Sequence, residues 1–286
     1  MHAPAGGPRR AGAIHFLTDY GDADELAGVV RAVLARLAPG APVVDLTHQV
    51  APFDVRAGAL ALERAAPHLG PGVVLAVVDP GVGTDRLAVA VSVPAGDAPR
   101  ALVGPDNGLL ARAADALGGA TGAVALAPQP GEGRATFDGR DVFAPAAAAL
   151  WRGAALEELG EPVAPDSLVR LPEPGLVVSE VEVAAEVLWV DRFGNVQLAA
   201  RPADGRAAGI DRGGRVELRA GGAVHHAPFV RAFAELDAPG VAGAEGIGVL
   251  VDANGRLAVV CARQAAATVL GVREGDTVTL RRGRPA

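Results

Sequence analysis

The stretch Gly72-Val73-Val74-Leu75-Ala76-Val77-Val78-Asp79-Pro80-Gly81 indicates how this chain folds. Its apolar run, bounded by Gly72 and Pro80, is typical of a β-strand that is buried on both faces. Such strands belong to sheets that helices cover on each side. Asp79 follows the run directly. It would therefore lie at the carboxyl end of the strand, where α/β sheets bind their ligands.

Strand and helix patterns alternate on both sides of this stretch. Apolar runs predict further strands, and 3.6-residue periodicity predicts helices. The expected strands are 14–18, 42–46, 87–93 and 101–103, and the expected helices are 24–37, 55–65, 109–117 and 142–150. This alternation predicts an α/β N-terminal domain, residues 1–172, with a largely parallel central sheet flanked by helices.

The pattern changes near residue 172. Residues 173–180 begin with Glu173-Pro174-Gly175 and are expected to form a linker. Residues 181–286 then alternate in short apolar runs separated by turn residues. The expected strands are 181–190, 215–218, 247–251, 257–260 and 277–280, and the expected turns include Asp204-Gly205, Gly213-Gly214 and Asn254-Gly255. This pattern predicts a smaller C-terminal antiparallel β-barrel domain.

The composition excludes several classes of protein. The chain has 286 residues, half of them hydrophobic, and a net charge of −7. Charged residues make up 21% of the chain, which argues against a disordered protein, and a mildly acidic chain does not predict nucleic-acid binding. No long apolar stretch predicts a signal peptide or a membrane span, so we expect a cytoplasmic protein. The single cysteine, Cys261, lies in an apolar run and is expected to be a buried structural thiol.

Polar residues gather in four segments: 18–22, 79–86, 104–108 and 136–141. Each could be ordinary loop chemistry, but together they favour one polar pocket. Motifs for nucleoside triphosphates, zinc hydrolases and serine hydrolases are absent from the sequence. His225 and His226 are adjacent and would point to opposite faces of a strand, so no metal site is predicted. His48 is expected to be a hydrogen-bonded structural residue or to line the pocket.

Seven segments, in this order, resemble one known family. They are Thr18-Asp19-Tyr20-Gly21, Asp45-Leu46-Thr47-His48, Pro52-Phe53-Asp54-Val55, Val77-Val78-Asp79-Pro80-Gly81-Val82-Gly83-Thr84, Val103-Gly104-Pro105-Asp106-Asn107-Gly108, Gly139-Arg140-Asp141-Val142-Phe143-Ala144-Pro145 and Asp191-Arg192-Phe193-Gly194-Asn195. The chain resembles the S-adenosylmethionine (SAM) hydroxide adenosyltransferases, relatives of the SAM-dependent fluorinase and chlorinase. The resemblance implies a homotrimer with active sites between subunits. It also implies hydrolysis of SAM at ribose C5′ to adenosine and methionine, with no cofactor.

The resemblance also implies the site residues. Asp79 and Arg86 match two residues that handle the attacking water, and Asp138 stands where the family has a third, a histidine. Asp19 matches the residue that holds the ribose hydroxyls, and Asp191 the one that holds the methionine ammonium. The remaining expected substrate-binding residues are Phe53, Asn107, Phe137, Phe193, Asn195 and Phe233.

A carboxylate can take a proton from water, and a guanidinium can stabilise the developing hydroxide. The role of Asp138 stays open, because two neighbouring carboxylates could share a proton or could repel hydroxide. One alternative is a non-catalytic protein that binds SAM or adenosine, since the family histidine is missing. A second is a halogenase, which is disfavoured because Asp79 stands where halogenating relatives have a tyrosine and would repel a halide.

Overall fold

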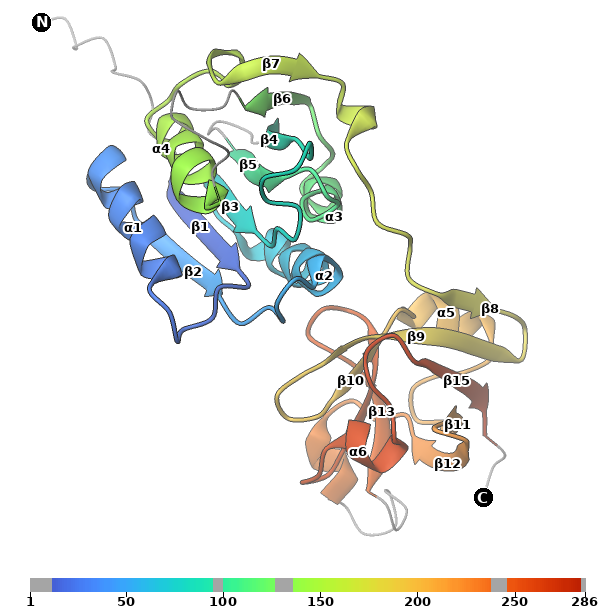
Figure 1. The fold of residues 1–286 in the computed structure, drawn as a ribbon. Helices are drawn as coiled ribbons and strands as arrows, with labels where there is room; N and C mark the ends of the chain where they lie inside the picture. The colour runs from blue at the N-terminus through green and yellow to red at the C-terminus, as the bar shows by residue number, and fades with distance from the viewer. Residues whose placement is uncertain (1–11, 95–99, 127–135, 238–245, 284–286) are drawn as a thin grey trace, which may run out of the picture. The chain divides into compact units, whose positions relative to one another are not determined.

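The computed structural model describes residues 12–94, 100–126, 136–237 and 246–283 (Figure 1). The chain divides into two compact units, Met1–Leu171 and Pro172–Ala286, which we call the first and second unit. Residues 1–11, on which the expectation about a signal peptide rests, lie outside the described part. None of the helices in the described part combines the length and apolar character that crossing a bilayer requires.

A seven-stranded sheet in the order β2-β1-β3-β5-β4-β6-β7 forms the centre of the first unit. The strands β2, β1, β3 and β5 are parallel, and β4, β6 and β7 continue the sheet in antiparallel pairs. Their bounds are β1 Ala13–Thr18, β2 Val43–Thr47, β3 Gly72–Val77, β4 Ala88–Ser92, β5 Arg100–Pro105, β6 Gly122–Leu126 and β7 Gly160–Val163. The predicted α/β class with a parallel core is confirmed.

Helices cover both faces of this sheet (Figure 1). The side chains of β3 alternate: Val73 and Leu75 pack in the cluster with α1 and α4, whereas Val74 and Ala76 pack in the cluster with α2 and α3. The helices are α1 Leu26–Leu37, α2 Val55–Ala65, α3 Ala111–Ala116 and α4 Ala144–Trp151, with a π-helical turn at Gly139–Phe143 before α4. Burial on both faces explains why the sequence of β3 is continuously apolar.

The second unit is an antiparallel sheet of eight strands that is nearly closed into a barrel. The order is β12-β11-β15-β9-β10-β14-β13, and β8 pairs with β9. A bridge between Phe229, which directly follows β12, and Val249, in the middle of β13, brings the first and last strands of this order together. The strands are β8 Leu176–Val178, β9 Glu182–Val190, β10 Val196–Leu198, β11 Arg215–Ala220, β12 Ala223–Pro228, β13 Ile247–Val251, β14 Leu257–Cys261 and β15 Thr277–Arg282, and the helices are α5 Pro202–Ala207 and α6 Ala266–Leu270. The predicted barrel is confirmed.

The structure differs from the sequence-based expectation in several elements. The predicted turn Asp204-Gly205 lies inside α5, where the Asp204 carboxylate accepts the backbone N–H of Arg201 at 2.7 Å. Residues 176–178, expected within a linker, form β8 and pair with β9. Four further strands were not predicted: β6, β7, β10 and β12. Pro162 masks β7, because proline removes a backbone donor, and β7 tolerates it as an edge strand that pairs only with β6.

The hairpin between β11 and β12 contains a turn signal that the pattern of apolar runs does not reveal. Ala220 pairs with Ala223, and only Gly221 and Gly222 connect them. Both glycines have positive φ, 56° and 83°, as a tight hairpin turn of the I′ type requires. The strand that follows contains His225 and His226 instead of an apolar alternation. The turn residues therefore predict this strand better than its own composition does.

Candidate active site

Three charged side chains meet beyond the carboxyl end of β3. Arg86 Nε donates to Asp79 Oδ1 at 3.0 Å, and Arg86 Nη2 donates to Asp79 Oδ2. The same Nη2 also donates to Asp138 Oδ2 at 2.5 Å. One guanidinium thus joins two carboxylates that lie 59 positions apart in the chain (138 − 79). The structure brings together all three residues that were predicted to handle water.

The loop between Asp79 and Arg86 is short and internally bonded, which fixes how the two side chains face each other. The hydroxyl of Thr84 donates to the Gly81 carbonyl at 2.6 Å, and the Arg86 backbone N–H donates to that hydroxyl at 3.4 Å. The guanidinium carbon of Arg86 also lies 5.3 Å from the centre of the Phe143 ring, within the range of a cation–π contact.

The three charged side chains are largely shielded from solvent. Their exposed fractions are 6% for Asp79, 10% for Arg86 and 15% for Asp138. Burial raises the pKa of the Asp79 carboxyl; Arg86 opposes this rise, and the charge of Asp138 adds to it. With both carboxylates ionised, the cluster carries a net charge of −1. Its field attracts a cation and repels an anion.

Asn107 and Asp106, which follow β5, hold neighbouring backbone in place. Asn107 Nδ2 donates to the Val78 carbonyl at 2.9 Å, and Asn107 Oδ1 accepts the N–H of Leu109 at 3.2 Å. Asp106 accepts the N–H of Val169 at 2.8 Å, and burial raises the pKa of its carboxyl. Asn107 therefore anchors the residue that immediately precedes Asp79.

Asp19 and Phe53 are bonded to each other at the edge of the same unit. Asp19 Oδ2 accepts the backbone N–H of Phe53 at 2.9 Å. Phe53 adopts a positive φ of 67° and is 71% exposed. A bulky residue with positive φ is uncommon, and such conformations concentrate at functional sites. Phe137 lies on another segment, where its ring contacts Tyr20 edge-to-face and Arg140 at 5.2 Å.

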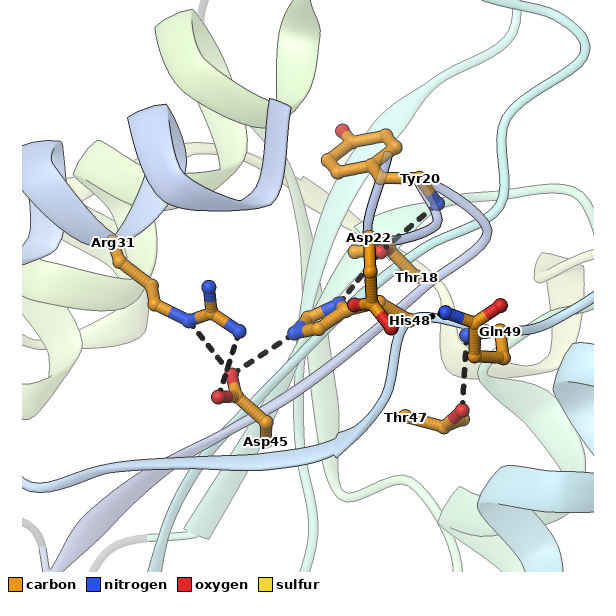
Figure 2. A network of polar contacts seen from close by, with 8 residues as sticks. All are labelled: Thr18, Tyr20, Asp22, Arg31, Asp45, Thr47, His48 and Gln49. Carbon is orange, nitrogen blue, oxygen red and sulfur yellow. Dashed lines mark hydrogen bonds and ion pairs between the residues drawn. The ribbon is translucent and has the colours of Figure 1, made fainter. Parts of the chain in front are cut away.

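A chain of hydrogen bonds supports the loop that carries Asp19 (Figure 2). The Thr18 hydroxyl accepts the N–H of Tyr20 at 3.2 Å and lies 2.8 Å from His48 Nδ1. His48 Nε2 donates to Asp45 Oδ1 at 3.0 Å, since a carboxylate can only accept. Arg31 donates to both oxygens of Asp45, at 3.1 and 2.8 Å. His48 is thus a buried structural residue, one of the two roles expected for it.

The pKa values of Asp45 and Asp79 are shifted in opposite directions by their surroundings. Partial burial acts to raise the pKa of Asp45, but the hydrogen bonds from Arg31 and His48 outweigh it and hold that pKa below its usual value. At Asp79 the effect of burial on the pKa is larger than the opposing effect of Arg86, so the pKa is raised. The difference follows from exposure, because the side chain of Asp45 is 40% exposed and stays hydrated.

The second unit contains a pocket of about 980 Å³ beside β10 and β14. Four predicted binding residues line it: Asp191, Phe193, Asn195 and Phe233. Two of them are exposed, Phe193 by 72% and Phe233 by 51%. The pocket also includes residues that sequence reasoning did not single out, namely Trp189, Arg231 and Asp252. The two-residue alternation of β9 places Trp189 on the side of Asp191, a signal that could have identified it.

A tight loop presents Asp191 and Asn195 to this pocket. Asp191 Oδ1 accepts the N–H groups of Phe193 and Asn195, both at 2.9 Å, and Asp191 Oδ2 accepts Asn195 Nδ2 at 2.8 Å. Gly194 has a φ of 83°, and a Cβ there would lie 2.3 Å from the Cβ of Ala265. Only glycine fits this position.

Three residues were not expected to bind a metal or to act in catalysis: Cys261, His225 and His226. Cys261 is buried in β14 and borders the pocket. His225 is buried and His226 is exposed, on opposite faces of β12 as expected. Among the residues that the structure describes, no group of three or more His, Cys, Asp or Glu side chains is arranged to hold a metal ion.

Comparison with known proteins gives a consistent result. Residues 14–160 match the model of the SAM hydroxide adenosyltransferase N-terminal domain, and residues 185–279 match that of its C-terminal domain. An (R)-S-adenosyl-L-methionine hydrolase of Salinispora tropica is 47% identical over 94% of this chain and 98% of its own length. A fluorinase of Actinoplanes is 27% identical, covering 93% of this chain and 96% of its own.

The fold has also been observed by crystallography. The crystal structure of an uncharacterized conserved protein of Thermotoga maritima superposes with a TM-score of 0.84 at 33% identity, covering 94% of this chain and all of that one. The order of the motifs, the two matched domains and the shared fold agree with one another. This chain belongs to the SAM hydroxide adenosyltransferase family.

Proposed function

We propose that this protein hydrolyses SAM at ribose C5′ and releases adenosine and L-methionine. The contact of Arg86 with both Asp79 and Asp138 is the observation that carries the proposal. Water oxygen forms a bond to C5′ as the C5′–S bond breaks, and the electron pair of that bond passes to sulfur. The sulfonium becomes a neutral thioether and needs no acid. The chemical demand is therefore on the nucleophile, from which one proton must be removed.

Asp79 is the proposed base. Its raised pKa makes it a better proton acceptor than an ordinary aspartate, provided that it is ionised. The positively charged guanidinium of Arg86 stabilises hydroxide as it develops. Asp138 balances Arg86 and gives the cluster its net charge of −1. The reaction needs no cofactor in this scheme.

The same charge favours water over a halide. A net negative site attracts the sulfonium cation of SAM and repels an incoming chloride or fluoride. Neutral water can enter, lose its proton to a carboxylate inside the site and only then become an anion. This argument supports hydrolysis over halogenation, although fluorinases are among the relatives of this chain.

The proposed substrate contacts use hydrogen-bonding groups and aromatic rings of both units. The amide nitrogen of Asn195 already donates to Asp191, so Asn195 Oδ1 is left to accept a hydrogen bond from the adenine amine. Phe193 and Phe233 offer exposed faces for stacking on the base. Asp191 would hold the methionine ammonium, and Asp19 the ribose hydroxyls. Phe53, Asn107 and Phe137 would complete the site.

Because these residues come from both units, we propose a homotrimer in which neighbouring subunits complete each site. The subunit mass is 28.6 kDa, so light scattering should give about three times that value. A monomer mass at working concentration would contradict this part of the proposal. We further propose that the protein acts in the cytoplasm on this small molecule, without a nucleic-acid or membrane partner.

The test is to incubate purified protein with SAM and to follow products by chromatography and mass spectrometry, with and without chloride. Adenosine and methionine should appear together, independently of chloride. Asp79→Ala should slow turnover by about 10²-fold or more, the usual contribution of a general base. A chlorinated nucleoside would support a halogenase instead. Intact SAM after long incubation, despite measurable binding, would support the non-catalytic alternative.

Asp138 is tested separately by Asp138→His, which restores the family residue. We expect higher turnover, because a neutral imidazole removes a negative charge from the neighbourhood of developing hydroxide. Lower turnover would show that this site works with a carboxylate pair.

A further inference from the structure

Tyr20 is the only tyrosine of the chain, and its side chain has no role in the network that fixes its backbone. The Thr18 hydroxyl accepts its N–H, and His48 holds that hydroxyl in turn. Figure 2 shows the Tyr20 side chain pointing away from these bonds. The network therefore positions Tyr20 without using its hydroxyl group.

The ring of Tyr20 is held tightly on the other side. It meets Phe137 edge-to-face, with ring centres 5.7 Å apart at 76°. Its hydroxyl lies so close to Gly139 that a Cβ there would be 2.0 Å from the oxygen. Glycine at 139 thus leaves room for the Tyr20 hydroxyl beside Asp138. Both rotation and withdrawal of the ring are restricted.

The hydroxyl itself is left over for another partner. Within the described residues, no protein group forms a hydrogen bond with Tyr20 Oη. Burial raises the pKa of the phenol well above its usual value, and the charges of Asp19, Asp79 and Asp138 raise it further. Tyr20 is consequently a neutral hydroxyl that can both donate and accept. A polar group that is held firmly in place and has no protein partner is suited to bind a ligand or a water molecule.

We propose that Tyr20 Oη positions the attacking water, an inference that rests on the proposed hydrolysis. The oxygen accepts one hydrogen of the water, and its own hydrogen takes no part in the step. The second hydrogen of the water passes to Asp79, and the water lone pair is left to form the bond to C5′. The hydrogen held by Tyr20 stays on oxygen and becomes part of the new 5′-hydroxyl. Tyr20 gains and loses no proton.

The experiment compares Tyr20→Phe with Tyr20→Leu. The phenylalanine variant removes only the hydroxyl and keeps the contacts with Phe137 and Gly139, whereas leucine removes the ring as well. A neutral hydrogen bond contributes about 0.5–1.5 kcal/mol. We therefore expect kcat to fall about 3- to 10-fold in Tyr20→Phe, with KM within twofold of wild type and an unchanged melting temperature. Tyr20→Leu should lose both turnover and stability.

The outcomes separate this inference from the function itself. If wild type cleaves SAM and Tyr20→Phe does so at the same kcat, the role of Tyr20 is wrong and hydrolysis stands. If Tyr20→Phe loses stability as Tyr20→Leu does and also raises KM, the residue is structural, which also overturns the inference. If wild type does not cleave SAM, both proposals fall. A reduced kcat with unchanged KM and melting temperature supports the inference.

Discussion

The two units prepare their candidate site residues in opposite ways. In the first unit Asp79 and Arg86 are 6% and 10% exposed, and their charges are paired with each other. In the second unit Phe193 and Phe233 are 72% and 51% exposed, beside an open pocket. Buried ions must be satisfied as the chain folds. Exposed aromatic rings need no such partner in the folded chain, and they contribute most when a ligand covers them. The contrast agrees with the proposal that the first unit supplies the reacting groups and the second the binding surface.

The sharpest test of this contrast is Arg86→Ala. The change leaves two largely buried carboxylates without their counter-ion, which typically destabilises a protein by about 3–5 kcal/mol. Turnover should also fall by about 10²-fold or more, because the charge that stabilises hydroxide is lost. Urea unfolding and the SAM assay measure the two effects.

The matched control is Arg273→Ala in the second unit, where the side chain is 90% exposed and 4.0 Å from Asp276. This variant should stay within about 0.5 kcal/mol of wild type. Equal losses for the two arginines would contradict the contrast between the units.

Phe193→Ala tests the other half of the comparison. Stacking of a base on an aromatic ring contributes about 1–3 kcal/mol, so we expect KM for SAM to rise about 10-fold while kcat changes little. The melting temperature should not change, because the ring is exposed. Phe143→Ala serves as the stability control, since this ring is fully buried and its loss should cost about 3–5 kcal/mol. A stability loss in Phe193→Ala would show that the ring belongs to the fold.

The pH dependence tests the carboxylate pair. Asp79 must be ionised to act as base, and its pKa is raised, so kcat should increase with pH through a value above the ordinary aspartate pKa of about 3.9. The charge of Asp138 is one cause of that rise. Asp138→Asn should therefore move the acidic limb of the kcat profile to lower pH. A limb that moves upward would show that Asp138 chiefly holds Arg86 in place.

Arg31→Ala should have the smallest effect. Arg31 and Asp45 are 39% and 40% exposed, and such pairs contribute about 0.2–1 kcal/mol. The pKa of Asp45 is lowered in the folded protein, so its stabilisation is present above the pKa of the unfolded chain and is lost as pH falls through the folded value. The difference in free energy of unfolding between variant and wild type, measured with urea, should therefore become smaller as pH falls through this range. A loss of more than about 2 kcal/mol in the free energy of unfolding would mean that the network in Figure 2 is essential for holding the loop that contains Asp19.

Asp79 has the opposite linkage. Its raised pKa means that its stabilising contribution is present at low pH and is lost as pH rises through the folded value. Ionised Asp79 is thus retained at a cost to stability, which agrees with its proposed role as the base. The two aspartates of one unit differ because Asp45 lies near solvent and Asp79 does not.

Much of the fold could be predicted from local patterns. The apolar run of β3 predicted a strand covered on both faces, and the amphipathic stretches predicted the four helices of the first unit. Short strands escaped prediction. β10 has three residues, β7 contains Pro162 and β12 contains two histidines, so their pairing depends on neighbours rather than on their own composition. The motif order also gave the candidate site residues, but not their contacts.

The sequence by itself determined the family, the two classes of domain and the residues that carry charge near the strand ends. Those properties depend on residue type and spacing along the chain. Only the tertiary structure decided that Arg86 joins Asp79 to Asp138, that burial outweighs Arg86 in setting the pKa of Asp79, and that Gly139 accommodates the Tyr20 hydroxyl. These properties depend on distance and exclusion of water between segments far apart in sequence, which no local pattern records.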